Sequence, residues 1–476
     1  MGGRVLILTA GVGSGHNVAA GVLEDQVRQD PTMELVRRLD LLESTNDLYR
    51  DLYDDAYFNL VEAVPWLVEW GYDANDVPFR FRGLSAVWDR LNNTASVRAV
   101  KAFRPDLVIC THFMPARLVS LLLSRGELAA RLAVVTTDYD FQGLWLTSTF
   151  ARFFVAREET RAHLLAIGIP GDRVTVSGIP VRPLLGRPVD ADEVRRRFDL
   201  RPDRPTLLIS AGAAGGAYTT AIVEQTMRIT TPFQAVVVCG RSATLRDDIV
   251  RRTHTQAGRY RVLGYTDRMA DLMRVANLFV GKPGGLSSSE CMAAGLPMVL
   301  VNPIPGQEER NADYLLEEGA AVRCNYETTV GYKIASLLRD PDRVGRMAAA
   351  ARRVGRPDAG TAVWSGVRDP EATSLWISRA AQRSILQASE QNTTPAMVEP
   401  GRRIRTLWGE DGASAGVLTT QQVHSLLPEP VETGRQLMLS DAMLQGRRRF
   451  RVDPDVLHTV RRILQGAPAR TLTLQD

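Results

Sequence analysis

Residues 4–23 read RVLILTAGVGSGHNVAAGVL and contain a strand, a glycine-rich turn and a helix in direct succession. The strand is the apolar run that ends at Ala10, and the glycines after it let the backbone turn sharply and approach a ligand closely. Apolar residues four positions apart, Val18 with Val22 and Ala19 with Leu23, indicate the helix. A strand that leads through a glycine turn into a helix is the opening unit of a doubly wound α/β domain.

The same alternation of strand and helix continues along the chain in two series. Runs such as VVVCG are apolar without interruption, which is typical of parallel strands covered by helices on both faces. The sequence therefore predicts an α/β protein with two facing, Rossmann-like, doubly wound sheets and a ligand site between them, at the carboxyl ends of the strands. The predicted strands are 4–10, 33–41, 106–112, 132–138, 152–157 and 173–178 in the first series, and 206–212, 234–240, 261–265, 278–282, 297–303 and 320–324 in the second.

A stretch rich in proline and charge, residues 180–205, separates the two series and is predicted to be a linker with one short helix. We therefore place an N-terminal domain at residues 1–185, a second domain at 186–360 and a C-terminal extension at 361–476. The extension is predicted to be irregular and partly helical, with helices at 419–427 and 454–465. Its sequence indicates no function.

Composition excludes several classes of protein. Of 476 residues, 45% are hydrophobic and 24% are charged, which is ordinary for globular proteins and excludes wholesale disorder or a collagen-like repeat. The 58 basic and 54 acidic residues give a net charge of +4, which is no footprint of a nucleic-acid-binding protein. The four cysteines lie far apart, without disulfide or metal-ligand spacing, so we expect buried thiols in a reducing compartment. No apolar stretch reaches the roughly 20 residues that span a bilayer, so we expect a soluble or peripheral intracellular protein.

The first glycine turn carries a histidine where a dinucleotide fingerprint would have its third glycine. The turn reads Gly11-Val12-Gly13-Ser14-Gly15-His16, so His16 falls at the start of the helix and faces the predicted cleft. A histidine there can remove a proton from a bound hydroxyl. The alternative is a tight strand-to-helix turn with a polar residue in the first helical turn. Sequence physics alone does not decide between the two.

The second half contains a turn of a similar kind, which reads GKPGGLSSSE at residues 281–290. Glycines and serines at the start of a helix offer donors for a phosphate group. Ser287 and Glu290 also fit a capping box, which needs no ligand. The segment IPGQEE at residues 304–309 suits recognition of sugar hydroxyls, and Gly212 belongs to a third loop, SAGAAGG, that would face the same cleft.

Seven segments together resemble a known family, the diacylglycerol glycosyltransferases of bacterial type and the related monogalactosyldiacylglycerol synthases of glycosyltransferase family 28. The pattern is more distantly similar to the enzyme that adds N-acetylglucosamine to the lipid precursor of peptidoglycan. The resemblance covers about residues 4–355 and implies a glycosyltransferase-B fold, with the lipid acceptor bound by the N-terminal domain and the UDP-sugar by the second. The segments are VLILTAGVGSGH, VVTTDYDFQGLW, VSGIPVRP, VVVCG, VLGYTDRM, GKPGGLSSSE and VNPIPGQEERNA.

The resemblance implies a role for each matching residue. His16 would be the base for the acceptor hydroxyl, in a loop that includes Gly13 and Gly15, and Asp138 would be a rival base or the partner that orients His16. In the family, transfer inverts the anomeric centre and needs no metal. The resemblance implies no cofactor either, because the UDP-sugar is a substrate. The residues matched to the donor are Gly284, Gly285 and Ser287 at the diphosphate, Glu290 at the ribose, Gln307 and Glu308 at the hexose, and Tyr265 and Met269 at the uracil, with Lys282 undecided between phosphate and surface.

Two features near Asp138 qualify the resemblance. Relatives commonly have a histidine at the position of Gln142, so an acid–base role is in doubt there. Asp138 and Asp140 also spell the D-x-D with which other glycosyltransferases hold a divalent ion, but they follow a strand of the first half, away from the nucleotide domain. We therefore expect no metal site.

A diacylglycerol acceptor would require contact with a membrane. Residues 55–88 are rich in aromatic and aliphatic side chains, with Trp66 and Trp70 among them, next to several arginines. This composition suits either a segment at the membrane interface or a helical insertion packed on the N-terminal domain. The basic run at 447–451 could add attraction to anionic lipid or simply be solvated. The resemblance implies a cytoplasmic protein, peripheral on the inner face of the cell membrane.

Three other functions stay open at the level of sequence. The first is a glycosyltransferase that uses a UDP-sugar with a polyprenyl-linked or soluble acceptor. The second is a non-catalytic protein that binds a UDP-sugar or a lipid, and the third and weakest is a dehydrogenase. UDP-glucose and UDP-galactose are equally compatible with Gln307 and Glu308.

Overall fold

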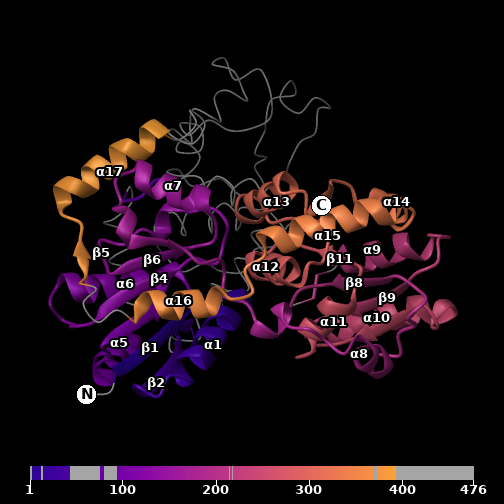
Figure 1. Ribbon diagram of the computed structural model, residues 1–476, viewed down its shortest axis with the longest axis horizontal. Helices are drawn as coiled ribbons and strands as arrows, with labels where there is room; N and C mark the ends of the chain where they lie inside the picture. Colours follow the sequence, from indigo (N-terminus) through magenta and orange to yellow (C-terminus); the bar gives the residue numbers. More distant parts are fainter. Residues whose placement is uncertain are drawn as a thin grey trace, which may run out of the picture.

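The structure, a computed structural model, describes residues 3–11, 14–42, 76–79, 94–213, 215–216, 218–368 and 373–392. Figure 1 shows two lobes side by side, the first drawn mainly in indigo and purple and the second in magenta to orange. Each lobe is built on its own six-stranded sheet in which all neighbouring strands are parallel. The prediction of two doubly wound sheets is confirmed.

The first sheet has the strand order β2-β1-β3-β4-β6-β7. Its core strands are buried on both faces, as their uninterrupted apolar sequences predict. The chain runs from β1 to β2 on one side and then to β3 on the other, so the topological switch point lies between β1 and β3. The strands are β1 (Gly3–Thr9), β2 (Met33–Asp40), β3 (Leu107–Cys110), β4 (Arg131–Val135), β6 (Arg152–Val155) and β7 (Val174–Val176).

Helices cover both faces of the first sheet. Val5 and Ile7 point to the face covered by α1 (Ser14–Arg28) and α16 (Ala359–Val367). Leu6 and Leu8, the alternate residues of the same strand, point to the opposite face. That face is covered by α5 (Thr94–Phe103), α6 (Phe113–Ser124), α7 (Glu158–Ala166) and α17 (Arg379–Asn392).

The second sheet has the order β10-β9-β8-β11-β12-β13, with its switch point between β8 and β11. Its strands are β8 (Thr206–Ser210), β9 (Gln234–Val238), β10 (Tyr260–Leu263), β11 (Leu278–Gly281), β12 (Met298–Val301) and β13 (Ala321–Cys324). The helices of this lobe are α8 (Ala191–Arg197), α9 (Tyr218–Met227), α10 (Ala243–Thr253), α11 (Met269–Val275), α12 (Gly285–Ala294), α13 (Gln307–Glu317), α14 (Val330–Leu338) and α15 (Pro341–Val354).

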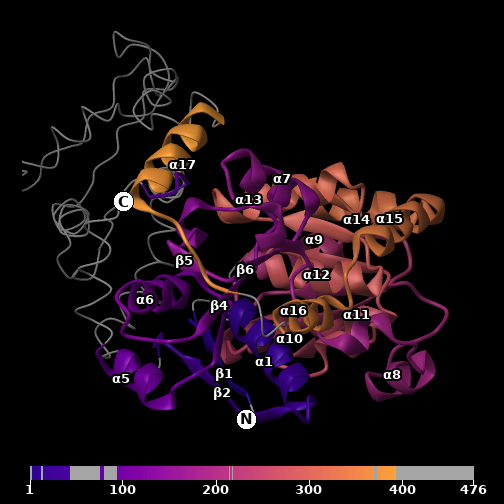
Figure 2. The same ribbon diagram turned by 60° about the vertical axis from the view of Figure 1, so that its left-hand side comes forward.

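After α15 the chain returns to the first lobe, as the orange helices α16 and α17 show in Figure 2. Trp364 of α16 donates from its indole nitrogen to the buried Asp30 at 3.1 Å, and Arg368 pairs with the same carboxylate at 3.1 Å. Strand β14 (Leu375–Trp376) then pairs antiparallel with β5 (Thr149–Phe150). Helix α16 therefore spans the predicted boundary at residue 360, and by packing residues 359–368 and 373–392 belong to the first lobe. The helices predicted at 419–427 and 454–465 lie outside the described residues.

Candidate active site

The carboxyl ends of the two sheets meet at the seam between the lobes. The glycine turn after β1 reaches α12, because a methyl group at Gly15 would touch the Cβ of Leu286 at 3.4 Å. A methyl group at Gly285, the first residue of α12, would overlap the carbonyl oxygen of Thr137, which follows β4. The loops at the two switch points therefore touch, where open parallel sheets bind their ligands.

His16 lies in the first turn of α1, with one ring nitrogen held by the first sheet. Its Nδ1 is 3.0 Å from the carbonyl oxygen of Thr111 and 2.8 Å from the hydroxyl of Thr137. A carbonyl can only accept, so Nδ1 carries the proton and Nε2 of the neutral ring keeps its lone pair. Burial lowers the pKa of His16, while the charges of Asp138 and Asp40 oppose this shift. The neutral imidazole is the form that a general base requires.

A second histidine that the sequence analysis missed lies beside His16. His112 follows β3 on the other side of the switch point, and the two ring centroids are 4.5 Å apart at 78°. Its Nδ1 accepts the backbone N–H of Met114 at 3.1 Å, which caps α6 and leaves Nε2 protonated in the neutral ring. Burial and the neighbouring His16 hold the pKa of His112 well below its usual range. Its place directly after a buried strand was the available signal.

Asp40, at the end of β2, anchors the turn that carries His16. Its carboxylate accepts the backbone N–H of Gly11 at 3.1 Å and the side-chain amide of Asn17 at 2.9 Å. A methyl group at Gly11 would crowd the same carboxylate, so the turn needs glycine there. Asp40 was not singled out from the sequence, although it too ends a strand at the switch-point edge.

Asp138 is buried and is held by the second lobe. Gln307 donates its amide to one carboxylate oxygen at 2.6 Å, and Asn311 donates to the other at 3.2 Å. Both oxygens thus accept amide hydrogens, which is the arrangement of an ionised carboxylate. Burial raises the pKa of Asp138, whereas His16 and the two amides oppose the rise.

Tyr139 continues this contact across the seam. Its backbone N–H donates to Oδ1 of Asn311 at 3.1 Å, and its phenol oxygen lies 2.6 Å from the hydroxyl of Ser289 in α12. The rings of Tyr139 and Tyr314 also pack, with their centroids 4.7 Å apart. Segment 138–140 is therefore seated between α12 and α13.

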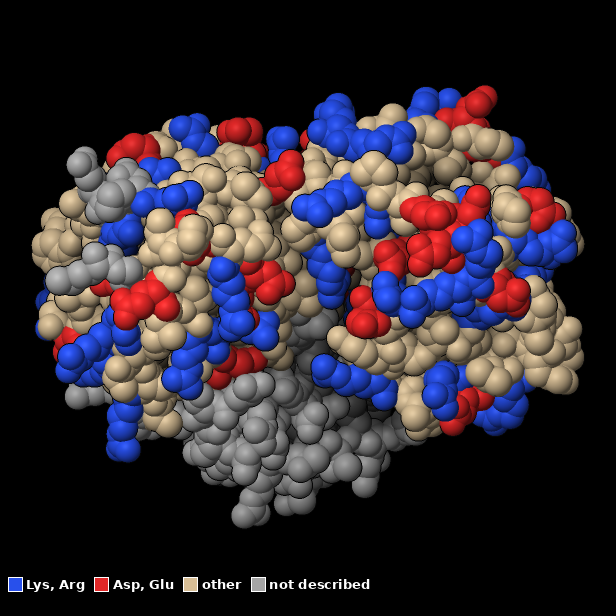
Figure 3. Space-filling view, turned by 60° about the horizontal axis from the view of Figure 1, so that its bottom comes forward, with Lys and Arg blue, Asp and Glu red and all other residues tan. Residues whose placement is uncertain are grey.

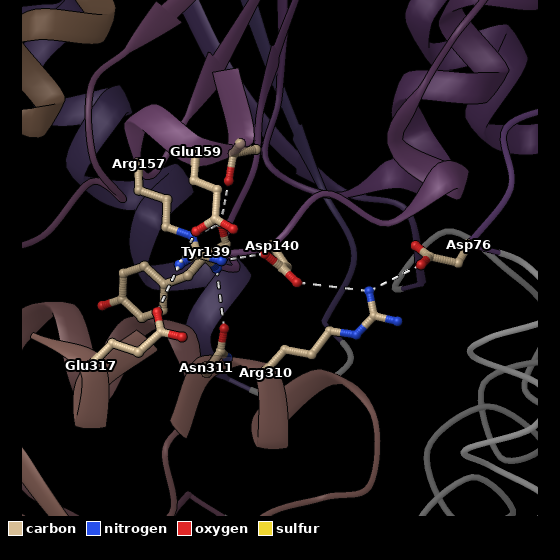
Figure 4. A network of polar contacts seen from close by, with 9 residues as sticks. Asp76, Tyr139, Asp140, Arg157, Glu159, Arg310, Asn311 and Glu317 are labelled. Carbon is tan, nitrogen blue, oxygen red and sulfur yellow. Dashed lines mark hydrogen bonds and ion pairs between the residues drawn. The ribbon is translucent and has the colours of Figure 1, made fainter. Parts of the chain in front are cut away.

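Asp140 lies in a chain of ion pairs that Figure 4 shows running from Arg157 to Asp76. Arg157 binds Asp140 at 2.6 Å, and Arg310 of α13 lies 3.8 Å from Asp140 and 3.0 Å from Asp76. The carboxylates of Asp138 and Asp140 thus have protein donors as partners.

The second glycine turn follows β11 and opens α12. Gly284 is the N-cap and has no side-chain cap bond, so the alternative of a capping box with Ser287 as the cap is wrong. Glu290 instead points to the linker, where Arg182 binds its carboxylate at 2.6 Å. Burial raises the pKa of Glu290 and Arg182 opposes the rise. The sequence analysis missed Arg182, which lies far from Glu290 along the chain.

The residues matched to the hexose lie at the start of α13. Glu308 accepts the backbone N–H of Ile304 at 2.7 Å, which fixes its carboxylate inside the turn. Its oxygen would lie 3.5 Å from a methyl group at Gly284, so the two turns are neighbours. Burial raises the pKa of Glu308 and Lys282 opposes the rise. Lys282 also lies over the ring of Tyr218, with 5.4 Å from Nζ to the ring centroid, and its contact with phosphate stays a prediction.

The remaining residues that the sequence predicts for the site lie in other loops and helices of the two lobes. Gly212 has a φ of +78°, which only glycine adopts readily, and a methyl group there would meet no atom within 4 Å. Tyr265 is 63% exposed, with the guanidinium of Arg241 5.6 Å from its ring centroid, and Met269 begins α11. Gln142 is buried. Gly13, Trp66 and Trp70 lie outside the described residues, so their predicted roles stay predictions.

Of the aromatic segment 55–88, the structure describes residues 76–79, and these pack on the first lobe. A methyl group at Gly143 would overlap the carbonyl oxygen of Asp76, and Val77 is buried. Within the described ranges no helix has both the length and the apolar character needed to cross a bilayer. On the face in Figure 3, basic and acidic side chains are interspersed over the described parts of both lobes, in keeping with the small net charge.

The chain matches two family models and a set of curated relatives. Residues 16–181 match the model of monogalactosyldiacylglycerol (MGDG) synthase, and residues 206–357 match the C-terminal domain of glycosyltransferase family 28. Processive diacylglycerol β-glucosyltransferases of Bacillus cereus (strain 03BB102) and Bacillus anthracis (strain A0248) are 28% identical over 365 residues. These alignments cover 75% of this chain and 90% of each relative.

Solved structures share the fold at low sequence identity. MnaA of S. aureus in a UDP co-structure has a TM-score of 0.54 and 14% identity, over 77% of this chain and 96% of that one. UDP-GlcNAc 2-epimerase of Neisseria meningitidis bound to UDP-GlcNAc has a TM-score of 0.50 and 14% identity, over 76% and 99%. The fold is glycosyltransferase-B, and because an epimerase shares it, the fold alone does not define the reaction. The two family models match in order along the chain, one on each lobe: the chain is an enzyme of the hexosyltransferase type with the two domains of a family 28 glycosyltransferase, and over most of its length it is similar to diacylglycerol glucosyltransferases.

Proposed function

We propose that this protein transfers a hexose from UDP-glucose or UDP-galactose to the free hydroxyl of diacylglycerol, with inversion at the anomeric carbon and without a metal ion. The observation that carries the proposal is the position of Thr137. Its hydroxyl lies 2.8 Å from Nδ1 of His16, and its carbonyl oxygen abuts Gly285 at the start of α12. One residue thus joins the base to the turn that binds the diphosphate.

The base side of the reaction is assigned to His16. With Nδ1 committed to Thr111 and Thr137, Nε2 takes the proton of the acceptor hydroxyl. The acceptor oxygen then forms its bond to C1 of the sugar while the bond from C1 to the β-phosphate oxygen breaks, and UDP leaves with the electron pair. Attack from the face opposite the leaving group inverts the configuration. General base catalysis of this kind contributes about a hundredfold to ten-thousandfold.

The leaving-group side is assigned to the second lobe. The free N–H groups at the start of α12 and the positive end of its dipole stabilise charge on the departing diphosphate. Lys282 adds a full positive charge at the same turn. Gln307 and Glu308 contact the hexose hydroxyls, and Glu290, oriented by Arg182, accepts the ribose hydroxyls. Fixed protein charges therefore do what a metal ion does in other transferases.

A lipid acceptor is supported by an apolar cluster beside the histidines. Ala10, Leu42 and Met114 form a small buried cluster, and Phe113 packs against both this cluster and the larger core layer that α6 covers. Phe113 stacks on His112 with 4.3 Å between ring centroids. An apolar wall next to the base suits the glycerol and acyl ends of diacylglycerol better than a soluble sugar. The names of the Bacillus relatives support the same acceptor. Action on a lipid requires the protein to bind peripherally at the inner face of the membrane.

One assay tests the proposal. Purified protein is incubated with each UDP-sugar, with and without diacylglycerol in mixed micelles and in the presence of EDTA, and the lipid product and its anomeric configuration are identified. A β-linked hexosyl diacylglycerol formed at the same rate with EDTA is expected. Transfer only to a polyprenyl or soluble acceptor contradicts the lipid assignment. Tight UDP binding with neither transfer nor hydrolysis indicates a binding protein instead.

A further inference from the structure

Helix α13 faces the first lobe with a single row of polar side chains. Gln307, Arg310, Asn311, Tyr314 and Glu317 follow the spacing of three and four residues that places side chains on one helical face. Each of them contacts segment 138–140 or Arg157 of the first lobe. Figure 4 shows Arg310, Asn311 and Glu317 of this row beside Tyr139, Asp140 and Arg157. The contacts that this row of α13 makes with the first lobe are thus mainly polar and directional.

Asn311 is the most constrained member of this row. It is 0% exposed, its amide nitrogen donates to Asp138, and its amide oxygen accepts the backbone N–H of Tyr139. Both halves of the amide are therefore used across the seam. A buried amide without partners is costly, so this side chain favours one arrangement of the two lobes.

The same contacts indicate a role for Asp138. Each carboxylate oxygen of Asp138 accepts an amide hydrogen from α13, so the second lobe fixes the position of this side chain. His16, by contrast, is held by the first sheet, through the contacts of its Nδ1 with Thr111 and Thr137. The two side chains therefore have different roles: His16 acts on the proton, and Asp138 positions the lobes.

We propose that Asp138 and Asn311 form a strut that holds the two lobes closed in the reactive arrangement, so that Asp138 is a positioning residue. The inference rests on the proposed function. Helix α13 begins with Gln307 and Glu308, which contact the hexose in that function. The strut therefore sets the distance between the hexose-binding turn and His16. When the lobes part, the bonds from Gln307 and Asn311 to Asp138 and from Tyr139 to Asn311 break together. The distance between the hexose and His16 then increases.

Exchanging the two side chains tests the strut. In Asn311→Asp two carboxylates face each other, and kcat is expected to fall about 10- to 100-fold. Asp138→Asn places two amides opposite each other and is expected to lower kcat less. The double variant D138N/N311D restores one amide and one carboxylate. Its new amide, at position 138, accepts from Gln307 and donates to the new carboxylate at position 311, which also accepts from the backbone of Tyr139. The kcat of the double variant is expected to return to within about fivefold of the parent.

Two further measurements make each outcome decisive. The rate of hydrogen exchange at the Tyr139 backbone amide measures whether the strut is formed and does not depend on enzyme turnover. This rate is expected to rise in Asn311→Asp and to fall again in the double variant. The Kd for UDP is expected to stay within about twofold in all three variants, because the strut does not touch the nucleotide. Asp313→Asn changes a charge on the exposed face of the same helix and serves as the control.

The outcomes separate the strut from the proposed function. Recovery of both kcat and Tyr139 protection supports the strut. If protection returns in the double variant but activity does not, Asp138 acts chemically and the proposal fails. If neither returns, the contact does not close the lobes and the proposal fails as well. Absence of hexose transfer in the parent protein contradicts the proposed function alone, and exchange at Tyr139 still tests the strut.

Discussion

The two lobes use nearly the same sheet and place different chemistry at its edge. The loops at the first switch point present buried titratable groups: His16, His112 and, after the next strand, Asp138. The loops at the second present glycines, the start of α12 and carboxylates that are already held, Glu290 by Arg182 and Glu308 by a backbone N–H. The first edge is equipped to move a proton and the second to bind an anion and hydroxyl groups.

The difference shows how one architecture supports a two-substrate reaction. Parallel sheets gather their loops at one edge, and two such edges facing each other bring the two kinds of chemistry into contact. The candidate base, His16, comes from the first lobe, and the glycine turn at the start of α12 comes from the second. Changes at the histidine loops of the first lobe should therefore affect turnover, and changes at the diphosphate and ribose positions of the second lobe should affect donor affinity.

His16→Ala tests the first half of this comparison and has the largest expected effect. Removal of the base should lower kcat about a hundredfold to ten-thousandfold. The Kd for UDP should be unchanged, because the imidazole is held by the first sheet. Initial rates with saturating donor and calorimetric UDP binding measure the two quantities. His163→Ala in α7 is the control, and normal turnover in His16→Ala would remove the histidine from the mechanism.

Sequence reasoning predicted the architecture well because the signals for it are local. Uninterrupted apolar runs between helical segments define the central strands of both sheets, such as β1, β3, β8 and β9, and glycine turns define the loops at the switch points. His16 and the second glycine turn were found because each combines a strand end with a distinctive turn. The fold and the chemically active loops can therefore be predicted from one sequence.

The partners of these loops could not be predicted, because they come from distant parts of the chain. Asn311 meets Asp138 and Arg182 meets Glu290 only once the lobes are docked. The capping-box alternative for Ser287 and Glu290 fitted the spacing but failed because α12 begins at Gly285, which places Ser287 inside the helix. The return of α16 to the first lobe also depends on tertiary contact, above all the bond from Trp364 to Asp30.

Gly285→Ala tests the seam itself and has the next largest effect. The added methyl group would overlap the carbonyl oxygen of Thr137, and neither backbone can move aside without parting the lobes. Overpacking of this kind costs about 1–3 kcal/mol, which corresponds to roughly a 5- to 150-fold loss in kcat/KM. Gly345→Ala in α15 is the control, since a methyl group there meets no atom within 4 Å and should slightly stabilise the helix. Equal activity of the two variants would show that the seam need not close as tightly as described.

Glu290→Gln tests the second lobe. The change keeps the shape of the side chain but removes the charge that pairs with Arg182 and accepts the ribose hydroxyls. A hydrogen bond to a charged group contributes about 1.5–3 kcal/mol, so the Kd for UDP should rise roughly 10- to 150-fold while kcat at saturating donor changes little. Glu318→Gln removes an exposed pair with Arg353 and should change neither value. A variant that loses kcat but keeps its UDP affinity would contradict the division of labour between the lobes.

The smallest effect is expected from pH near neutrality, and its direction follows from the surroundings of His16. The base must be neutral, and burial lowers the pKa of His16 from 6.5. Lowering the pH from 8 to 7 should therefore reduce kcat/KM by less than about a quarter, whereas below the pKa the rate should fall about tenfold per unit. The charge of Asp138 raises the pKa of His16 and so opposes the effect of burial. Asp138→Asn should therefore move the pH at which kcat/KM begins to fall to a still lower value. Rates with a short-chain diacylglycerol between pH 5 and 9 measure this pH dependence. A midpoint well above 6.5 would mean that Asp138 outweighs burial and that the two groups titrate as a pair, with the proton chemistry shared across the seam.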